Sequence, residues 1–95
     1  MTVDWTERAT RDLRAAYDYW AEQESERAAS RMLQVIFSAV EILERFPEVG
    51  RCGRIPGTRE LVISPTPFLI AYRVRPNSVE ILALLHGARK WPGSF

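Results

Sequence analysis

The chain opens with a short alternating segment followed by an apolar series of helical period. Val3 and Trp5 flank Asp4, an apolar and polar alternation that is typical of a short β-strand. Thr6 follows at the position of a helix N-cap. Apolar residues then recur every three or four positions, with charged residues largely between them, which predicts an amphipathic helix. The apolar series of this helix is Ala9, Leu13, Ala16, Tyr17 and Trp20.

A second helix is predicted after the polar stretch AEQESER (21–27). Ser25 can cap it, and Pro47 ends it because proline cannot donate a backbone hydrogen bond inside a helix. Its apolar series is Met32, Val35, Ile36, Ala39, Val40, Leu43 and Phe46. Since only a short turn joins the two helices, we expect an antiparallel helical hairpin.

After residue 58 the period changes to two. Residues 47–58 (PEVGRCGRIPGT) are rich in glycine and proline, so we expect a connection there. Three strands are predicted next, at 59–64 (RELVIS), 67–74 (PFLIAYRV) and 79–86 (VEILALLH). The predicted fold is therefore α+β, in the order β-α-α-β-β-β, with the helical hairpin packed on one face of a small, mostly antiparallel sheet.

Alternation along the strands predicts which side chains share a face of this sheet. The predicted sets are Arg59, Leu61 and Ile63; Leu69, Ala71 and Arg73; Leu82, Leu84 and His86. Whether the three sets lie on the same side depends on the strand register, which the sequence leaves open.

Length and composition favour one folded domain spanning residues 1–95, with 46% hydrophobic and 26% charged residues. No signal peptide is recognisable and no apolar run approaches the length of a membrane span, so we expect a cytoplasmic protein without a membrane partner. Cys52 is the single cysteine, which excludes an internal disulfide and a cysteine-rich zinc site. We interpret Cys52 as an unreactive loop residue and expect no metal and no cofactor.

The charges divide sharply along the chain. Residues 1–49 carry six arginines and ten carboxylates, a net charge of −4, whereas residues 50–95 carry six arginines, one lysine and two glutamates, a net charge of +5. A split of this size favours an acidic partner for the second half, such as a nucleic acid, a phosphate-rich complex or an acidic protein segment.

The single histidine, His86, ends the last predicted strand and is the strongest candidate for catalysis. A histidine acting as acid or base, with Arg59, Arg73 and Arg89 holding phosphate charge, could cleave a phosphodiester. The sequence shows no Ser-His-Asp spacing, no cluster of metal ligands and no phosphate-binding glycine motif. The alternative is a structural His86 that hydrogen-bonds a backbone group.

Two other basic features leave alternatives open. Arg73 interrupts an apolar strand, so it either pairs with Glu60 or Glu80 or reaches a partner from the face of the sheet. A second basic group follows the last strand: Arg89, Lys90 and Trp91. This group can present cations and an aromatic ring to a partner, or it can be a solvated tail.

Four segments resemble the ParE branch of the RelE/ParE toxins of type II toxin–antitoxin systems. They are the opening VDWTERATRDL (3–13) with YDYW (17–20), then GRIPGTRELV (53–62), FLIAYRV (68–74) and VEILALLHGARKWP (79–92). The likeness covers nearly the whole chain, and residues 57–62 and 81–92 are its most specific parts.

The resemblance implies the same hairpin-on-sheet fold and a function. ParE-like toxins stabilise the DNA-cleavage complex of DNA gyrase, which arrests growth, and a ParD-like antitoxin neutralises them in plasmid-stabilisation and related systems. A toxin–antitoxin hetero-oligomer and no sequence-specific nucleic-acid binding of the toxin's own are then expected. The residues expected to bind target or antitoxin are Arg59, Arg73, His86, Arg89, Lys90 and Trp91.

Two alternatives follow from the same superfamily. RelE-like members cut messenger RNA on the ribosome, and His86, Arg59 and Arg73 match places where their basic residues occur. Gly87 stands where some of those nucleases carry an aromatic residue, and Lys90 is the only lysine, so the lysine cluster of others is missing. The other alternative is an inactive toxin that only binds its antitoxin.

Overall fold

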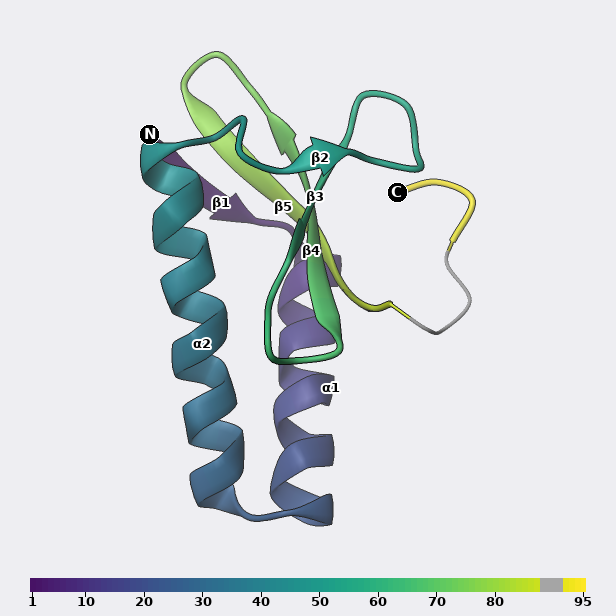
Figure 1. Ribbon diagram of the computed structural model, residues 1–95. Helices are drawn as coiled ribbons and strands as arrows, with labels where there is room; N and C mark the ends of the chain where they lie inside the picture. Colours follow the sequence, from purple (N-terminus) through teal and green to yellow (C-terminus); the bar gives the residue numbers. More distant parts are fainter. Residues whose placement is uncertain (88–91) are drawn as a thin grey trace.

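The computed structural model describes residues 1–87 and 92–95. Figure 1 shows two long helices lying side by side and a small twisted sheet against their upper half. The elements follow one another as β1 (Thr2–Trp5), α1 (Glu7–Gln23), α2 (Glu26–Arg45), β2 (Arg51–Cys52), β3 (Arg59–Val62), β4 (Phe68–Val74) and β5 (Ser78–His86). None of the helices in these residues is long and apolar enough to cross a membrane.

The sheet confirms the predicted fold class and adds one strand. Its order is β1-β5-β4-β3-β2, with β1 parallel to β5 and the other neighbours antiparallel. The prediction that residues 47–58 form only a connection was wrong, because Arg51 and Cys52 pair with Glu60 and Arg59 as a two-residue edge strand. A strand this short shows no periodicity, so it cannot be recognised from the pattern of apolar residues.

The helix boundaries follow from side chains that satisfy free backbone N–H groups. The Thr6 hydroxyl accepts a hydrogen bond from the Ala9 N–H at 3.1 Å, and the Ser25 hydroxyl accepts one from the Ala28 N–H at 3.0 Å. Both predicted N-caps are thereby confirmed. The second helix ends at Arg45, just before the predicted stop.

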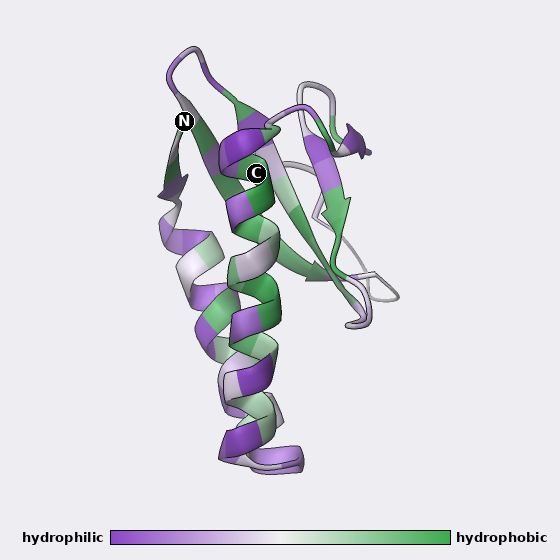
Figure 2. Cartoon of the chain, turned by 60° about the vertical axis from the view of Figure 1, so that its left-hand side comes forward, coloured by the Kyte–Doolittle hydropathy of each residue, from purple (hydrophilic) through white to green (hydrophobic). Residues whose placement is uncertain are grey.

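The main core lies between the helical hairpin and one face of the sheet. In Figure 2 the green, hydrophobic side of α2 faces the strands. The largest fully buried side chains of this core are Tyr72, Ile36, Leu43, Ile70, Ile81 and Val79. Trp5 and Trp20 pack against this core, and both are only partly buried. Phe46 does not belong to it: it lies at the C-cap of α2 and is 63% exposed.

The register resolves which side chains share a face. A smaller buried cluster on the face away from the helices contains Leu69, Ala71, Ala83 and Leu85. Tyr72 pairs with Ile81 whereas Ala71 pairs with Ala83, so a bulge lies at Leu82. The predicted set Leu82, Leu84 and His86 was therefore wrong at Leu82, because the bulge lets Ile81 and Leu84, three residues apart, both join the helix-side core. Leu84 and His86 do share a side, since both line the same cleft against α1.

Candidate functional site

Five arginines gather where β2 and β3 begin and β4 ends, a region that we call the arginine end: Arg51, Arg54, Arg59, Arg73 and Arg75. Glu60 is its buried anchor, with only 3% of the residue exposed. The Glu60 Oε1 atom accepts hydrogen bonds from Nε and Nη2 of Arg51 at 3.2 and 3.1 Å, and its Oε2 accepts one from the Arg54 N–H at 2.8 Å. The carboxylate thus fixes the Arg51 guanidinium while 59% of that side chain stays exposed.

A second carboxylate holds two further arginines on the same sheet. Arg73 donates from Nε and Nη2 to Glu80 Oε1 at 3.1 and 2.7 Å, and Arg75 lies 3.5 Å from the same oxygen. Of the alternatives that the sequence left open for Arg73, pairing with Glu80 is the one observed. The hydrogen bond from Arg73 is the main reason that the pKa of Glu80 lies below its usual value.

Arg59 and Tyr72 face the helix side of this end. Arg59 Nη1 donates to the carbonyl oxygens of Glu48 and Gly50 at 3.1 and 2.8 Å, which ties the segment after α2 to β3. Tyr72 lies opposite Arg59 in the register, and its hydroxyl accepts a hydrogen bond from the Gly50 N–H at 2.8 Å. Burial raises the pKa of Tyr72, against the opposing effects of the Gly50 N–H and the Arg59 charge.

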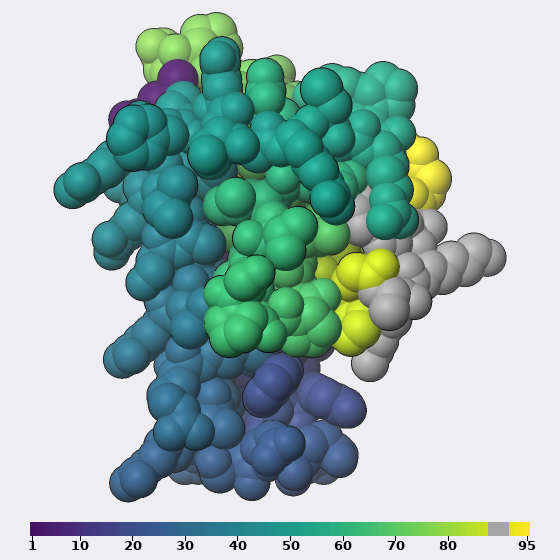
Figure 3. Space-filling model, viewed as in Figure 1, coloured from purple at the N-terminus to yellow at the C-terminus, as the bar shows by residue number. Residues whose placement is uncertain are grey.

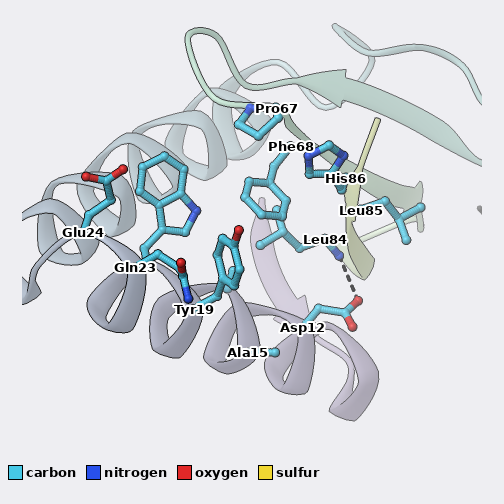
Figure 4. A pocket seen from close by; sticks show the side chains of 12 residues that line it. Asp12, Ala15, Tyr19, Gln23, Glu24, Pro67, Phe68, Leu84, Leu85 and His86 are labelled. Carbon is cyan, nitrogen blue, oxygen red and sulfur yellow. Dashed lines mark hydrogen bonds between the residues drawn. The ribbon is translucent and has the colours of Figure 1, made fainter. Parts of the chain in front are cut away.

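His86 lies in a different place, in a cleft of about 720 Å³ between α1 and the ends of β4 and β5, which we call the aromatic cleft. Figure 4 shows Glu24 at one end of it and Asp12 at the other. The His86 ring packs edge-to-face on Phe68, with the ring centroids 5.7 Å apart. The described residues that line the aromatic cleft are Asp12, Ala15, Ala16, Tyr19, Trp20, Gln23, Glu24, Pro67, Phe68, Leu84, Leu85 and His86.

The structure does not bring the candidate nuclease residues together. His86 pairs with Phe68 and Arg59 pairs with Tyr72, four residues further along β4, which is roughly 13 Å at the usual rise of a strand. Arg73 follows Leu69 and Ala71 on the face away from the helices. Arg89, Lys90 and Trp91 lie outside the described residues, so their predicted role as a binding surface stays a prediction.

No other reactive centre is visible in the described part of the chain. Cys52 is exposed on the edge strand β2, not in a loop as predicted. Residues 1–87 and 92–95 contain no group of three or more histidine, cysteine or carboxylate side chains that could hold a metal ion.

Sequence reasoning missed the α1 wall of the aromatic cleft. Tyr19 offered a signal in the sequence, because it is an aromatic residue that lies outside the predicted apolar series of its helix and is therefore expected at the surface. In the structure it is 53% exposed. Asp12 gave no comparable signal, since a carboxylate on a helix face is ordinarily solvated. Its Oδ2 atom accepts a hydrogen bond from the Leu84 N–H at 3.1 Å, a contact between residues 72 positions apart.

Comparison with known proteins places the chain in a family. The family model described as "ParE toxin of type II toxin-antitoxin system, parDE" matches residues 3–91. The putative toxin Y4kP of Sinorhizobium fredii is 41% identical over 90 residues, which are 95% of this chain and 92% of that protein. Toxin RelE2 of Caulobacter vibrioides is 41% identical over 87 residues, covering 92% of this chain and 96% of the relative.

Solved structures agree with this assignment. A chain from the structure titled "Chromosomal ParDE TA system from P. aeruginosa" matches with a TM-score of 0.81 and 30% identity, over 88% of this chain and 92% of that one. The YoeB dimer from Staphylococcus aureus shares the fold alone, with a TM-score of 0.59 and 14% identity over 87% of this chain and 92% of that one. The chain therefore belongs to the ParE toxin family of type II toxin–antitoxin systems, within the RelE/ParE superfamily.

Proposed function

We propose that this type II toxin inhibits DNA gyrase by stabilising its DNA-cleavage complex, and that a ParD-like antitoxin neutralises it in the cytoplasm. The likeness that carries the proposal is the match to a chain of a ParDE system, because it combines 30% identity with a TM-score of 0.81 over most of both chains. On this proposal the toxin acts by binding and catalyses no reaction.

The arginine end supports a role in binding an acidic partner segment. Glu60 and Glu80 hold the guanidinium groups of Arg51 and Arg73 by one edge and Glu80 also contacts Arg75, while these three arginine side chains remain between 42 and 59% exposed. A pre-oriented arginine loses less conformational entropy when it meets a carboxylate than a freely rotating one does. An acidic antitoxin segment would thus be attracted and held at this end of the sheet.

A ribosome-dependent endoribonuclease is the second candidate. The relative named RelE2 and the fold shared with YoeB favour it. The distance between His86 and Arg59, and the position of Arg73 on the other face, count against it, since an acid or base and the phosphate-holding groups must reach the same phosphodiester. An inactive toxin that only binds its antitoxin is the third candidate, and growth arrest on expression would contradict it.

Two parallel assays with purified protein separate these functions. Gyrase with supercoiled DNA is scored for trapped, cleaved DNA, and a translating ribosome with a defined message is scored for internal cuts. Trapped DNA with an intact message is the expected result, and addition of a ParD-like antitoxin should abolish it. Cut message without trapped DNA would overturn the proposal, and His86→Ala should then remove the cutting.

A further inference from the structure

The aromatic cleft exists because α1 (Glu7–Gln23) extends beyond the end of β5 (Ser78–His86), the strand against which it packs. β1 pairs with β5 only from Ser78 to Ile81, whereas β5 continues to His86. From Asp12 onward, α1 itself runs along this second half of β5, with the Asp12 carboxylate on the Leu84 N–H. Figures 1 and 3 show the helical hairpin projecting well beyond the sheet, so the cleft lies in the angle between the two layers.

The chemistry of the cleft differs from that of the arginine end. Four of its lining residues carry rings, Tyr19, Trp20, Phe68 and His86, and two are alanines, Ala15 and Ala16. Figure 4 shows the rings of Phe68 and His86 next to each other. Carboxylates mark its two ends, and no lysine or arginine occurs among its described lining residues, but the Nε atom of Arg8 lies 3.6 Å from the Asp12 Oδ2 atom and offsets the charge at that end. This cleft therefore favours apolar groups in the middle and positive charge at the Glu24 end.

The end of α1 adds to the negative potential. The last turn of α1 contains no basic residue, so no lysine or arginine of that turn offsets the partial negative charge of its terminal carbonyl groups. Glu24 occupies the C-cap at the same place. Aromatic faces such as those of Tyr19 and Trp20 also attract cations.

We propose that the aromatic cleft is a docking site for a protein segment with apolar residues in its middle and a basic residue at the Glu24 end. Asp12 and Glu24 are twelve residues apart, which is about 18 Å along a helix. An extended peptide spans that distance with about five residues. The exposed Glu24 carboxylate would repel an acidic segment such as the one assigned to the arginine end, so the two regions favour chemically different segments. This goes beyond the proposed function, because it does not depend on what the toxin inhibits.

The test uses two synthetic peptides that differ only in charge, acetyl-Arg-Leu-Phe-Leu-Arg-amide and acetyl-Glu-Leu-Phe-Leu-Glu-amide. Each is titrated into the isotope-labelled, full-length chain, and the backbone amide shifts are followed by NMR. We expect the arginine peptide to shift the amides of Tyr19, Gln23 and His86 with saturation, and the glutamate peptide to bind at least tenfold more weakly. Equal binding of both peptides, shifts confined to other surfaces, or no saturable shifts at millimolar peptide would each overturn the proposal.

Matched variants distinguish the cleft from the general charge of the protein. Glu24→Lys should weaken the arginine peptide at least threefold, whereas Glu41→Lys, the same change at an exposed position of α2 outside the cleft, should leave its affinity unchanged. Ala15→Lys, which places a cation in the cleft at another exposed position, should act like Glu24→Lys. An equal effect of the Glu24 and Glu41 variants would contradict a local site. The gyrase assay does not enter this test, so either proposal can fail alone.

Discussion

The arginine end and the aromatic cleft lie on the same small sheet but differ in how far their side chains are already engaged. At the arginine end the polar groups hold one another: Glu60 accepts three hydrogen bonds, Glu80 contacts two arginines, and the Tyr72 hydroxyl accepts one from a backbone N–H. In the cleft, Tyr19 is half exposed and Glu24 lies beyond the end of its helix. Side chains at the first region therefore stabilise the fold, whereas Tyr19 and Glu24 at the second remain exposed to a partner.

The largest effect is expected from Glu60→Ala. The change leaves the Arg54 N–H without its carboxylate and releases Arg51, whose charge can still reach water. We expect a loss of about 2–3 kcal/mol in the free energy of unfolding, at the lower edge of what breaking a buried charge pair costs. Urea denaturation of this variant and of Glu41→Ala, an exposed control, measures it. Equal stability of the two variants would show that the arginine end does not hold the fold.

The second largest loss in the free energy of unfolding is expected from Tyr72→Phe. It removes the hydroxyl that accepts the hydrogen bond of the buried Gly50 N–H, and the apolar ring stays in place. An unsatisfied buried donor costs about 1–2 kcal/mol. Tyr19→Phe is the matched control in the cleft, because Tyr19 is 53% exposed, and its unfolding free energy should not change measurably. If both changes cost the same, the contrast between the two regions is wrong.

Glu80→Gln should give a smaller, pH-dependent loss. The pKa of Glu80 is lowered in the folded state, so its ionised form adds stability that is fully present above the unfolded-state pKa near 4.5 and disappears as the pH falls through the folded-state value. At pH 7 we expect a loss of about 0.5–1 kcal/mol, as for a partly exposed ion pair. The difference in melting temperature between wild type and variant should persist at pH 6 and shrink below about pH 4.5. A difference that grows on acidification would contradict the role assigned to Arg73.

The sequence predicted the elements well because their signals are local. Thr6 and Ser25 lie next to the apolar series that they cap, and each of the three longer strands carries its own alternation. What was missed depends on contacts between distant segments. The bulge at Leu82 changes the face of every later residue in β5. Leu82 is an ordinary apolar residue within an apolar run, so the sequence gives no sign of the bulge.

The same reason explains the outcome for the site. His86, Arg59 and Arg73 were grouped as candidate nuclease residues because they end or interrupt apolar strands, which is visible in the sequence. Their separation depends on the register between β3, β4 and β5. The cleft forms because β1 pairs with only the first half of β5 and α1 covers the second half. This arrangement depends on how the layers assemble and cannot be read from any single segment.

The smallest effect on stability is expected from Tyr19→Ala, and this variant sharpens the comparison most. Tyr19 contributes an exposed ring to the wall of the cleft, so its removal should change the free energy of unfolding by less than about 0.5 kcal/mol. The same change should weaken the arginine peptide severalfold, because it removes one of the rings that its apolar residues and guanidinium groups would contact. Phe46→Ala, at an exposed aromatic residue outside the cleft, should affect neither quantity. A large loss of stability in Tyr19→Ala with unchanged peptide binding would reverse the assignment and make the cleft a structural feature.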